Sequence, residues 1–330
     1  MRLEPDTSES EGVTERQRFR RLLLEWFDRH KRDLPWRQDR DPYRVWLSEI
    51  MLQQTRVSAV TDHYQRFLRR FPTIQKLASA RESSVLAAWS GLGYYRRARM
   101  LHKAAKKVVK EHAGRFPGSA EALRALPGIG RYTAAAVASI AFDQPVAVVD
   151  GNVERVLQRV YGENLTGEVL WRAAEGLLRR GRPGDFNQAM MELGATLCLP
   201  RQPQCLLCPV SDLCATRGAL HKPEKGIRQM KREIHYAFAC QEGSIFLVQR
   251  PKTATLMAGM WELPEIAAVN DTNSAWLTLR HSITVTDYVV RVMRSPVPAG
   301  LAGCWVRKSG IATLPLTGLA RKILRAAKIM

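Results

Sequence analysis

The 330-residue sequence predicts a mainly α-helical N-terminal region followed by a smaller α+β region. Up to about residue 213, apolar side chains recur every three or four positions and the loops are short, which is typical of packed helices. Beyond residue 232, β-branched and aromatic runs of strand length replace that pattern. Four closely spaced cysteines and a polar, basic stretch lie between the two regions. The chain is therefore expected to fold into two principal parts.

The predicted helices follow from this spacing and from their end signals. Residues 18–30 carry Phe19, Leu23 and Phe27 at helical spacing. Asp41 and Pro42 mark the start of a second helix, because proline suits a first helical turn, and this helix is predicted to continue to about residue 61. The same reasoning predicts helices at residues 63–70, 83–88, 95–111, 120–126, 132–142, 153–161, 171–179 and 186–197.

The second part is predicted to hold strands at residues 235–240, 244–249, 282–292 and 304–306, and a closing amphipathic helix at 316–327. Residues 1–13 are acidic and polar, as in a disordered lead-in and unlike a signal peptide. No apolar run approaches the about 20 residues that a membrane helix needs. We therefore expect no membrane association and a cytoplasmic, nucleoid-associated protein.

Four cysteines are spaced C-x6-C-x2-C-x5-C: Cys198, Cys205, Cys208 and Cys214. Thiolates this close can converge on zinc or on an iron–sulfur cluster. The common zinc arrangement pairs two C-x2-C units and only one is present, so the spacing favours a [4Fe–4S] cluster. A disulfide framework is the third possibility, but it suits small secreted domains. Cys240 and Cys304 lie in apolar surroundings and are predicted to be buried.

The charge of the chain indicates the class of partner. There are 51 Lys+Arg against 31 Asp+Glu, a net charge of +20. Such an excess favours a polyanion, because each neutralised phosphate releases condensed counterions. A merely basic, soluble surface is the alternative.

A glycine turn adds to the case for nucleic acid. Residues 126–130, Leu-Pro-Gly-Ile-Gly, lie between two predicted helices. Gly128 and Gly130 permit a tight turn and a close backbone approach, and the N-terminus of the next helix, beginning near Arg131, can bind a phosphate. An ordinary helix–helix turn is the alternative, but the adjacent arginine and the basic chain favour the phosphate site.

Two carboxyl groups have contrasting surroundings. Glu49 lies mid-helix beside apolar side chains such as Trp46, where desolvation would raise its pKa and let it act as a general acid. Asp150 precedes a predicted helix as an N-cap shared with Asn152, where a negative charge is favoured. An ordinary glutamate and a plain helix cap are the alternatives. Glycosidic-bond cleavage uses one protonated and one ionised carboxyl.

Six segments and the cysteine set follow one another along residues 15–215. The segments are LPWR (34–37), PYRVWLSEIMLQQTRV (42–57), GLGYYRRARML (91–101), LPGIGRYTAAAV (126–137), VVDGNVERVL (148–157) and FNQAMMELG (186–194). Together they resemble the MutY-type adenine DNA glycosylases, which belong to the helix–hairpin–helix superfamily that includes endonuclease III.

The resemblance implies removal of adenine mispaired with 8-oxoguanine or guanine, after the nucleotide flips out of duplex DNA. Glu49 would protonate the base at N7. Asp150, with Asn152, would stabilise the oxocarbenium-like sugar and guide the incoming water. Tyr132 would support that charge, and it stands where strand-cleaving relatives carry a lysine. We therefore expect a monofunctional enzyme.

Further residues are assigned only through the resemblance. Gln54 and Tyr94 match residues that fill the gap left in the duplex. The adenine pocket is assigned to Trp36, Arg37, Leu52 and Gln188. For Gln54 and Gln188, generic surface polarity is the alternative. The resemblance also implies that the four cysteines hold a [4Fe–4S] cluster that shapes the loop at 199–213, and that the protein acts as a monomer.

The implied fold is a helix–hairpin–helix glycosylase region with a cluster loop, joined to a MutT/Nudix-like α+β domain. Its predicted layout is a glycosylase region at 14–216 (helical barrel 36–140, cluster-bearing part 14–35 and 141–216), a basic linker at 217–232 and a MutT-like domain at 233–330. The segment IFLVQRPKTATLMAGMWELPE (245–265) carries the second likeness. No acidic Nudix box is present, so hydrolysis of nucleoside triphosphates is not expected.

The second domain is expected to read 8-oxoguanine. In the family a Phe-Ser-His element does so, and the corresponding residues here are Ile283, Thr284 and Val285. Thr284 keeps a hydroxyl, but Val285 cannot replace the histidine. Two alternatives therefore stay open: a purine glycosylase of the same fold with a relaxed or different opposite-base requirement, and a non-catalytic lesion-binding iron–sulfur protein.

Overall fold

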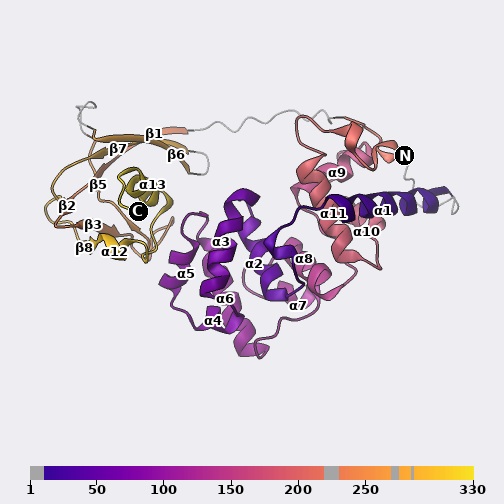
Figure 1. Ribbon diagram of the computed structural model, residues 1–330, viewed down its shortest axis with the longest axis horizontal. Helices are drawn as coiled ribbons and strands as arrows, with labels where there is room; N and C mark the ends of the chain where they lie inside the picture. Colours follow the sequence, from indigo (N-terminus) through magenta and orange to yellow (C-terminus); the bar gives the residue numbers. More distant parts are fainter. Residues whose placement is uncertain (1–10, 219–229, 269–274, 284–285) are drawn as a thin grey trace. The chain divides into compact units, whose positions relative to one another are not determined.

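The computed structural model describes residues 11–218, 230–268, 275–283 and 286–330, and these form two compact units (Figure 1). The first unit comprises Met1–Gln65, Thr73–Gln75 and Lys103–Pro223, and the second comprises Arg66–Pro72, Lys76–His102 and Glu224–Met330. The predicted fold class, a mainly helical region followed by a smaller region with mixed sheets, is confirmed. The predicted domain boundaries stay a prediction. Among the described residues, no helix is long and apolar enough to cross a membrane.

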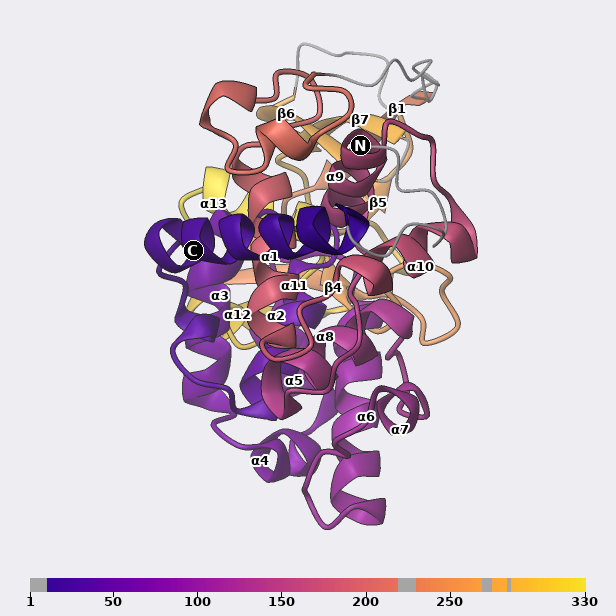
Figure 2. The same ribbon diagram turned by 90° about the vertical axis from the view of Figure 1, so that its right-hand side faces the viewer.

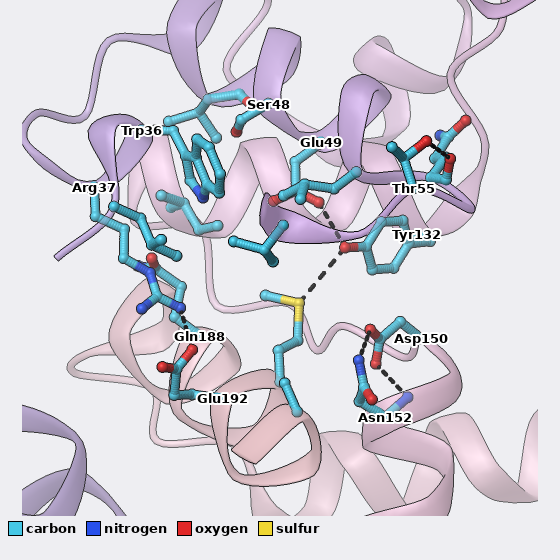
Figure 3. Close-up of a pocket in the computed structure, with 18 of the residues that line it drawn as sticks. Trp36, Arg37, Ser48, Glu49, Thr55, Tyr132, Asp150, Asn152, Gln188 and Glu192 are labelled. Atoms are coloured by element: carbon cyan, nitrogen blue, oxygen red, sulfur yellow. Dashed lines mark hydrogen bonds and ion pairs between the residues drawn. The ribbon is translucent and has the colours of Figure 1, made fainter. Parts of the chain in front are cut away.

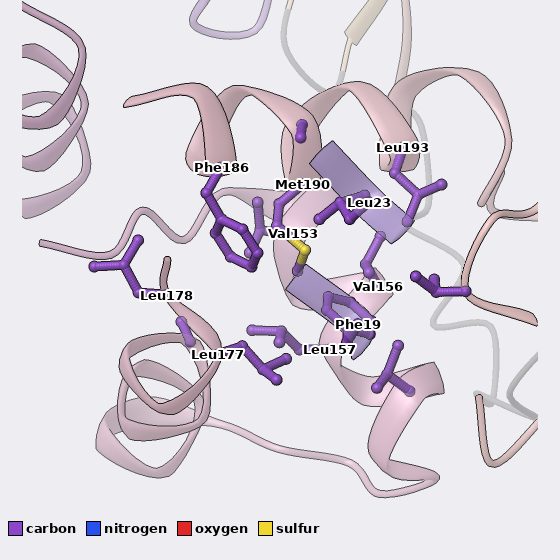
Figure 4. Close-up of a cluster of buried hydrophobic side chains, with 14 of the residues drawn as sticks. Phe19, Leu23, Val153, Val156, Leu157, Leu177, Leu178, Phe186, Met190 and Leu193 are labelled. Atoms are coloured by element: carbon purple, nitrogen blue, oxygen red, sulfur yellow. The ribbon is translucent and has the colours of Figure 1, made fainter. Parts of the chain in front are cut away.

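Four helices of the first unit share one apolar core: α1 (Glu11–His30), α9 (Gly151–Tyr161), α10 (Gly167–Leu177) and α11 (Pro183–Thr196). α1 lies against α10 and α11 (Figures 1 and 2) because its apolar residues recur on one face. Phe19 meets Phe186 of α11 with ring centroids 6.5 Å apart (Figure 4). Burial of one such side chain stabilises the fold by roughly 2 kcal/mol. The core thus joins the first helix to the helix that lines the pocket described below.

A second group of helices includes the two that flank the glycine turn and those packed beside them. It consists of η1 (Pro35–Arg37), α2 (Pro42–Leu52), α7 (Ala120–Arg124) and α8 (Arg131–Phe142). Asp41 caps α2 by accepting a hydrogen bond from the backbone N–H of Arg44, and Pro42 occupies its first turn, as predicted. α7 packs against α8, and in the turn between them Gly128 has φ 75°, which glycine adopts without strain.

The predicted single helix over residues 42–61 is wrong in its extent. α2 ends at Leu52, and α3 (Val57–Arg70) begins at Val57. Gln53 leaves the helix with ψ 117°, and Gln54 has φ 55°. A left-handed residue other than glycine interrupts a right-handed helix. This conformation depends on the surrounding structure, so the local apolar spacing did not reveal the break.

The second unit combines helices with the C-terminal sheets. Its helical part includes α5 (Glu82–Trp89) and the start of α6 (Arg96–Glu111). The hydroxyls of Ser90 and Tyr95 both donate to the backbone carbonyl of Leu316, at 2.9 and 2.8 Å. Arg321 Nε donates to Ser90 Oγ at 3.0 Å. These buried bonds hold the 90–95 loop against the C-terminal part of the same unit.

Two four-stranded sheets and α13 (Gly318–Ala326) form the apolar core of the second unit. One sheet has the order β5-β1-β7-β6, with bounds Glu265–Ile266, Met230–Ala237, Thr286–Met293 and Leu277–Ile283. Its β1–β7 pair is parallel and the other pairs are antiparallel. In the other sheet β3 (Ser244–Gln249) pairs antiparallel with β2 (Cys240–Gln241), β4 (Trp261–Glu262) and β8 (Cys304–Arg307). Two short helices complete the order, α4 (Ile74–Ser79) and α12 (Lys308–Ile311).

Two predictions for this region are wrong. The strand predicted at residues 282–292 belongs to two strands, because β6 ends at Ile283, opposite Thr286 at the start of the antiparallel β7. Cys240 and Cys304 are exposed, not buried. Each lies on a short strand whose pairing is with β3, so little structure covers it.

Candidate active site

Side chains from η1, α2, α8, α9 and α11 line a pocket of about 480 Å³ in the first unit (Figure 3). This volume is in the range of sites for small organic molecules. The pocket brings together most of the residues singled out from the sequence: Trp36, Arg37, Glu49, Leu52, Gln54, Tyr132, Asp150, Asn152 and Gln188.

Glu49 lies on the α2 wall of this pocket and is only 6% exposed. Tyr132 of α8 donates its hydroxyl to Glu49 Oε2 at 2.5 Å, and the same hydroxyl lies 3.5 Å from Sδ of Met191. Burial raises the pKa of Glu49 to about 7. The bond from Tyr132 and the charge of Arg37 lower this pKa, while the charge of Asp150 raises it. Glu49 therefore has the surroundings that a general acid requires near neutral pH.

Asp150 lies at the N-terminus of α9, below Tyr132 in Figure 3. Its Oδ1 accepts from the backbone N–H groups of Asn152 (2.9 Å) and Val153 (2.8 Å), and its Oδ2 accepts from Asn152 Nδ2 (3.0 Å). Asn152 is oriented in turn by Arg155, whose Nη2 donates to Asn152 Oδ1 at 2.8 Å. These bonds fix both carboxylate oxygens of Asp150 at the N-terminus of α9.

A second buried glutamate, Glu192 of α11, was missed in the sequence. It is 1% exposed and accepts from Arg32 Nε (2.6 Å), Arg32 Nη2 (2.8 Å) and Arg37 Nη2 (2.8 Å). Burial acts to raise its pKa, but the bonds from Arg32 and Arg37 outweigh burial and the pKa is lowered. Glu192 follows Gln188 by four residues, so helical spacing from that residue could have pointed to it.

Arg131, predicted to bind phosphate, lies just after the glycine turn, and Gly130 is the N-cap of α8. Its guanidinium stacks on Trp171, 3.9 Å from the ring centroid, and forms an ion pair with Glu168. Its side chain thus already holds an oxyanion, the Glu168 carboxylate. Both partners belong to α10, close to the turn in space but not in sequence.

The residues predicted to enter the duplex have uncommon backbone conformations. Gln54 has φ 55° and lines the pocket, while Tyr94 of the second unit has φ 46° and is 49% exposed. Such non-glycine residues are concentrated at functional sites. The guanidinium of Arg97 lies over the Tyr94 ring, 5.4 Å from its centroid. Thr284 and Val285 lie outside the described residues.

The four predicted metal ligands lie in the loop after α11, which includes η2 (Cys205–Leu207) and η3 (Ser211–Leu213). All four cysteines are partly buried. Burial raises the pKa of Cys208 to about 11, and the other three thiols add to this rise. Arg159 Nη1 lies 3.2 Å from Cys198 Sγ. Within the part of the chain that the structure describes, no group of three or more His, Cys, Asp or Glu side chains is placed to hold a metal ion.

Comparison with known proteins adds an independent observation. Residues 47–175 match the HhH-GPD superfamily base excision DNA repair proteins. The adenine DNA glycosylase of Schizosaccharomyces pombe is 33% identical over 321 residues, which cover 76% of this chain and 69% of the relative. The chain belongs to the adenine DNA glycosylase family. The family resemblance predicted from the sequence is thereby confirmed.

Other adenine DNA glycosylases show how far the likeness extends. The protein of Rattus norvegicus is 43% identical over 312 residues, covering 75% of this chain and 60% of the relative. That of Arabidopsis thaliana is 42% identical over 322 residues, covering 82% and 50%. The chain thus spans about 60% of the length of the rat member of the adenine DNA glycosylase family.

Solved structures confirm the helical fold seen in this adenine DNA glycosylase family member. A thermostable thymine-DNA glycosylase superposes with a TM-score of 0.59 at 34% identity, covering 62% of this chain and 97% of that one. An endonuclease III trapped on DNA superposes with a TM-score of 0.53 at 23% identity, which shows the fold alone.

Proposed function

We propose that this protein hydrolyses the N-glycosidic bond of adenine mispaired with 8-oxoguanine or guanine in duplex DNA, as a step of base-excision repair. One observation carries the proposal. In a single pocket, Glu49 has a pKa raised to about 7, while Asp150 has both oxygens held at a helix N-terminus. Glu49 can thus carry a proton near neutral pH beside an aspartate whose oxygens are held by fixed N–H donors, and cleavage of a glycosidic bond uses such a pair of carboxyl groups.

In the proposed reaction, the adenine nucleotide flips out of the duplex into the pocket. Glu49 donates its proton to N7 of the base. The C1′–N9 bond then breaks, and its electron pair leaves with the adenine, so positive charge develops on the sugar. The carboxylate of Asp150 stabilises this charge. A water molecule guided by Asp150 and Asn152 adds to C1′, and its released proton restores the acid form of Glu49.

The surrounding pocket residues would hold the adenine. Trp36 is 8% exposed and packs edge-on against Tyr64, with ring centroids 5.4 Å apart, so it offers a rigid aromatic wall. Arg37 is oriented by bonds to Glu192 and to the backbone carbonyl of Arg32. Together with Gln188 it can bond the edge of a base, while Leu52 supplies apolar contact.

Base release is proposed to occur without strand cleavage. A lyase step needs an amine that forms an imine with the sugar, and Tyr132 has none. Burial and the charges of Glu49 and Asp150 raise the pKa of Tyr132 well above its usual value, so its hydroxyl stays protonated and donates to Glu49. Tyr132→Lys is expected to gain some strand cleavage.

Duplex DNA is the proposed partner of a monomer, in the cytoplasm and on nucleoid DNA. The net charge of +20 and the family's endonuclease III-like fold support the DNA partner. Arg131, next to Gly128 and Gly130, would exchange the carboxylate of Glu168 for a DNA phosphate. Gln54 and Tyr94 would fill the space left by the flipped base.

The opposite base would be read by residues 233–330. A truncation after Arg217 should still release adenine but lose preference for 8-oxoguanine over guanine, because losing one or two base-edge hydrogen bonds costs about 1–3 kcal/mol of discrimination. Val285 favours a second candidate, a purine glycosylase with a relaxed opposite-base requirement. Val285→His should then raise the preference. An unchanged ratio in both variants would contradict this role of the C-terminal part.

We further propose that the cysteine loop holds a [4Fe–4S] cluster on Cys198, Cys205, Cys208 and Cys214. The chemistry of the donor set suits such a cluster, because it offers four partly buried thiols and an arginine N–H directed at one sulfur, although the described side chains do not form a closed metal-binding group. When bound, the cluster would cross-link the loop without taking part in hydrolysis, which transfers no electrons. Purified protein should contain iron and absorb broadly in the visible range. One zinc and no iron would refute the proposal.

The deciding test of the function is a single-turnover assay on duplexes with adenine opposite 8-oxoguanine, guanine or thymine. The expected products are free adenine and an intact strand with an abasic site, formed faster from the two mispairs. Binding without base release would support the non-catalytic lesion binder instead. Equal rates opposite all three bases would support a relaxed purine glycosylase.

A further inference from the structure

Asp150 reaches the pocket at the end of a segment without regular secondary structure, residues 143–150, which we call the strap. The strap has no helix and pairs with no strand. Ala147 and Val148 within it are both 2% exposed. Buried backbone N–H and C=O groups need hydrogen-bond partners, and here no neighbouring strand supplies them.

Two side chains supply the partners instead. Asn187 of α11 donates through Nδ2 to the carbonyl of Val146 (2.9 Å) and accepts through Oδ1 from the N–H of Val148 (3.1 Å). Glu175 of α10 accepts through Oε1 from the N–H of Ala147 (3.0 Å). Successive residues of an extended chain direct their polar groups to alternate sides. Asn187 and Glu175 thus take the places of two neighbouring strands.

Asn187 is itself held in one orientation. It is 3% exposed, and Nδ2 also donates to Ser139 Oγ of α8 at 2.9 Å. α11 crosses α8 so closely that a Cβ on Gly184 would lie 2.6 Å from the carbonyl oxygen of Ser139. The strap, α8 with Tyr132 and α11 with Glu192 are therefore tied together at one amide.

We infer that Asn187, supported by Glu175, is a positioning residue that holds Asp150 in place relative to Glu49 and Tyr132. The inference rests on the proposed function, because it requires Glu49 and Asp150 to be the reacting carboxyls. Three side chains affect the pKa of Glu49: Tyr132 of α8, Asp150 at the start of α9, and Arg37 of η1. Arg37 is in turn paired with Glu192 of α11. Moving Asp150 away removes the negative charge that raises the pKa of Glu49.

The test compares Asn187→Leu with Gln158→Leu. Gln158 is a suitable control because its buried amide (1% exposed) also makes several bonds, including 2.9 Å to the carbonyl of Leu165, but none to the strap. Asn187→Leu should slow single-turnover base release by about 10- to 100-fold, as for a displacement near 1 Å, with less than about a 3-fold change in duplex Kd. The descending limb of its pH–rate profile should move to lower pH. Gln158→Leu should lower Tm by a similar amount, with little change in the rate of base release and no shift of the descending limb.

A second pair keeps the test decisive if Asn187→Leu does not fold. Glu175 is exposed at the surface, and Glu175→Gln keeps an oxygen that can accept from Ala147. Glu175→Ala should slow base release and shift the limb, whereas Glu175→Gln should restore both. The inference would be overturned if the Asn187 and Gln158 variants lost the same rate of base release at the same decrease in Tm. It would also be overturned if the two Glu175 variants did not differ in rate or in the position of the limb. Loss of the proposed function looks different, because wild type would then release no adenine.

Discussion

Two walls of the same pocket each hold a buried glutamate, and they shift the pKa of that glutamate in opposite directions. Glu49 and Glu192 are 6% and 1% exposed, so both have lost nearly all contact with water. On the α2 wall, Glu49 has one hydroxyl partner, and burial raises its pKa to about 7. On the α11 wall, Arg32 and Arg37 hold Glu192 and its pKa is lowered.

The difference shows that burial alone favours a neutral carboxyl, and that fixed cations reverse this preference. Arg37 connects the two walls, because it bonds Glu192 and its charge also lowers the pKa of Glu49. The buried glutamate of the α11 wall is thus suited to stabilise the fold, and that of the α2 wall to transfer a proton.

The largest effect is expected from Glu49→Gln, which keeps the shape of the side chain but removes its proton. Base release should fall by about 10²- to 10⁴-fold, the usual contribution of a general acid, while duplex Kd stays nearly constant. Single-turnover kinetics and a binding titration measure the two quantities. The exposed Glu163→Gln, in the same unit, is the control. Wild-type rates in Glu49→Gln would remove Glu49 from the mechanism.

Glu192→Gln should mainly affect stability. Removing one partner of a buried ion pair costs about 3 kcal/mol or more, and the partly exposed Arg32 places this site near the lower value. Because the folded pKa of Glu192 is lowered, its stabilisation is present above the unfolded pKa and is lost as pH falls through the folded pKa. Urea unfolding should therefore separate the variant from wild type at pH 7 and bring them together in acid.

Glu25→Gln is the matched control for this stability experiment. Glu25 pairs with Arg21 at 3.3 Å, with both side chains exposed. Such a surface pair contributes only about 0.5 kcal/mol. A Glu192→Gln variant no less stable than Glu25→Gln would show that the buried charge is not structural.

The wild-type rate should depend on pH through Glu49. Its protonated form is the active one, so base release should be constant below a pH of about 7 and fall about tenfold per unit above it. Single-turnover rates between pH 5 and 9 measure this limb. A descending limb near pH 4.5, the ordinary value for a glutamate, would contradict the raised pKa.

The smallest effect is expected from Tyr132→Phe. The lost hydroxyl donates to Glu49 and lowers its pKa, so its removal should move the descending limb to higher pH, by about one unit or less. The rate at pH 7 should change less than about tenfold, far less than in Glu49→Gln. A limb shifted to lower pH would mean that Tyr132 does not stabilise the ionised form of Glu49.

Much of the molecule could be predicted from the sequence because its signals are local. Apolar spacing predicted most helices, Asp41–Pro42 predicted the start of α2, and Asp150 was recognisable as a helix cap. These features depend on residues within one or two turns. The predictions that a helix continues through Gln54 and that Cys240 is buried were wrong, because tertiary packing decides both features.

The chemistry of the pocket depends on contacts between distant segments, which local patterns do not contain. Glu49 and Tyr132 are 83 residues apart in the chain, and Arg32 and Glu192 are 160 apart. Helical spacing from Gln188 could place Glu192 on the same helix face, but no local pattern shows that two arginines hold it. A carboxyl's pKa is set by the charges and donors within a few ångströms and by the loss of water. The sequence alone therefore does not determine which glutamate has a raised pKa and which pairs with two arginines. The packing of the helices determines both.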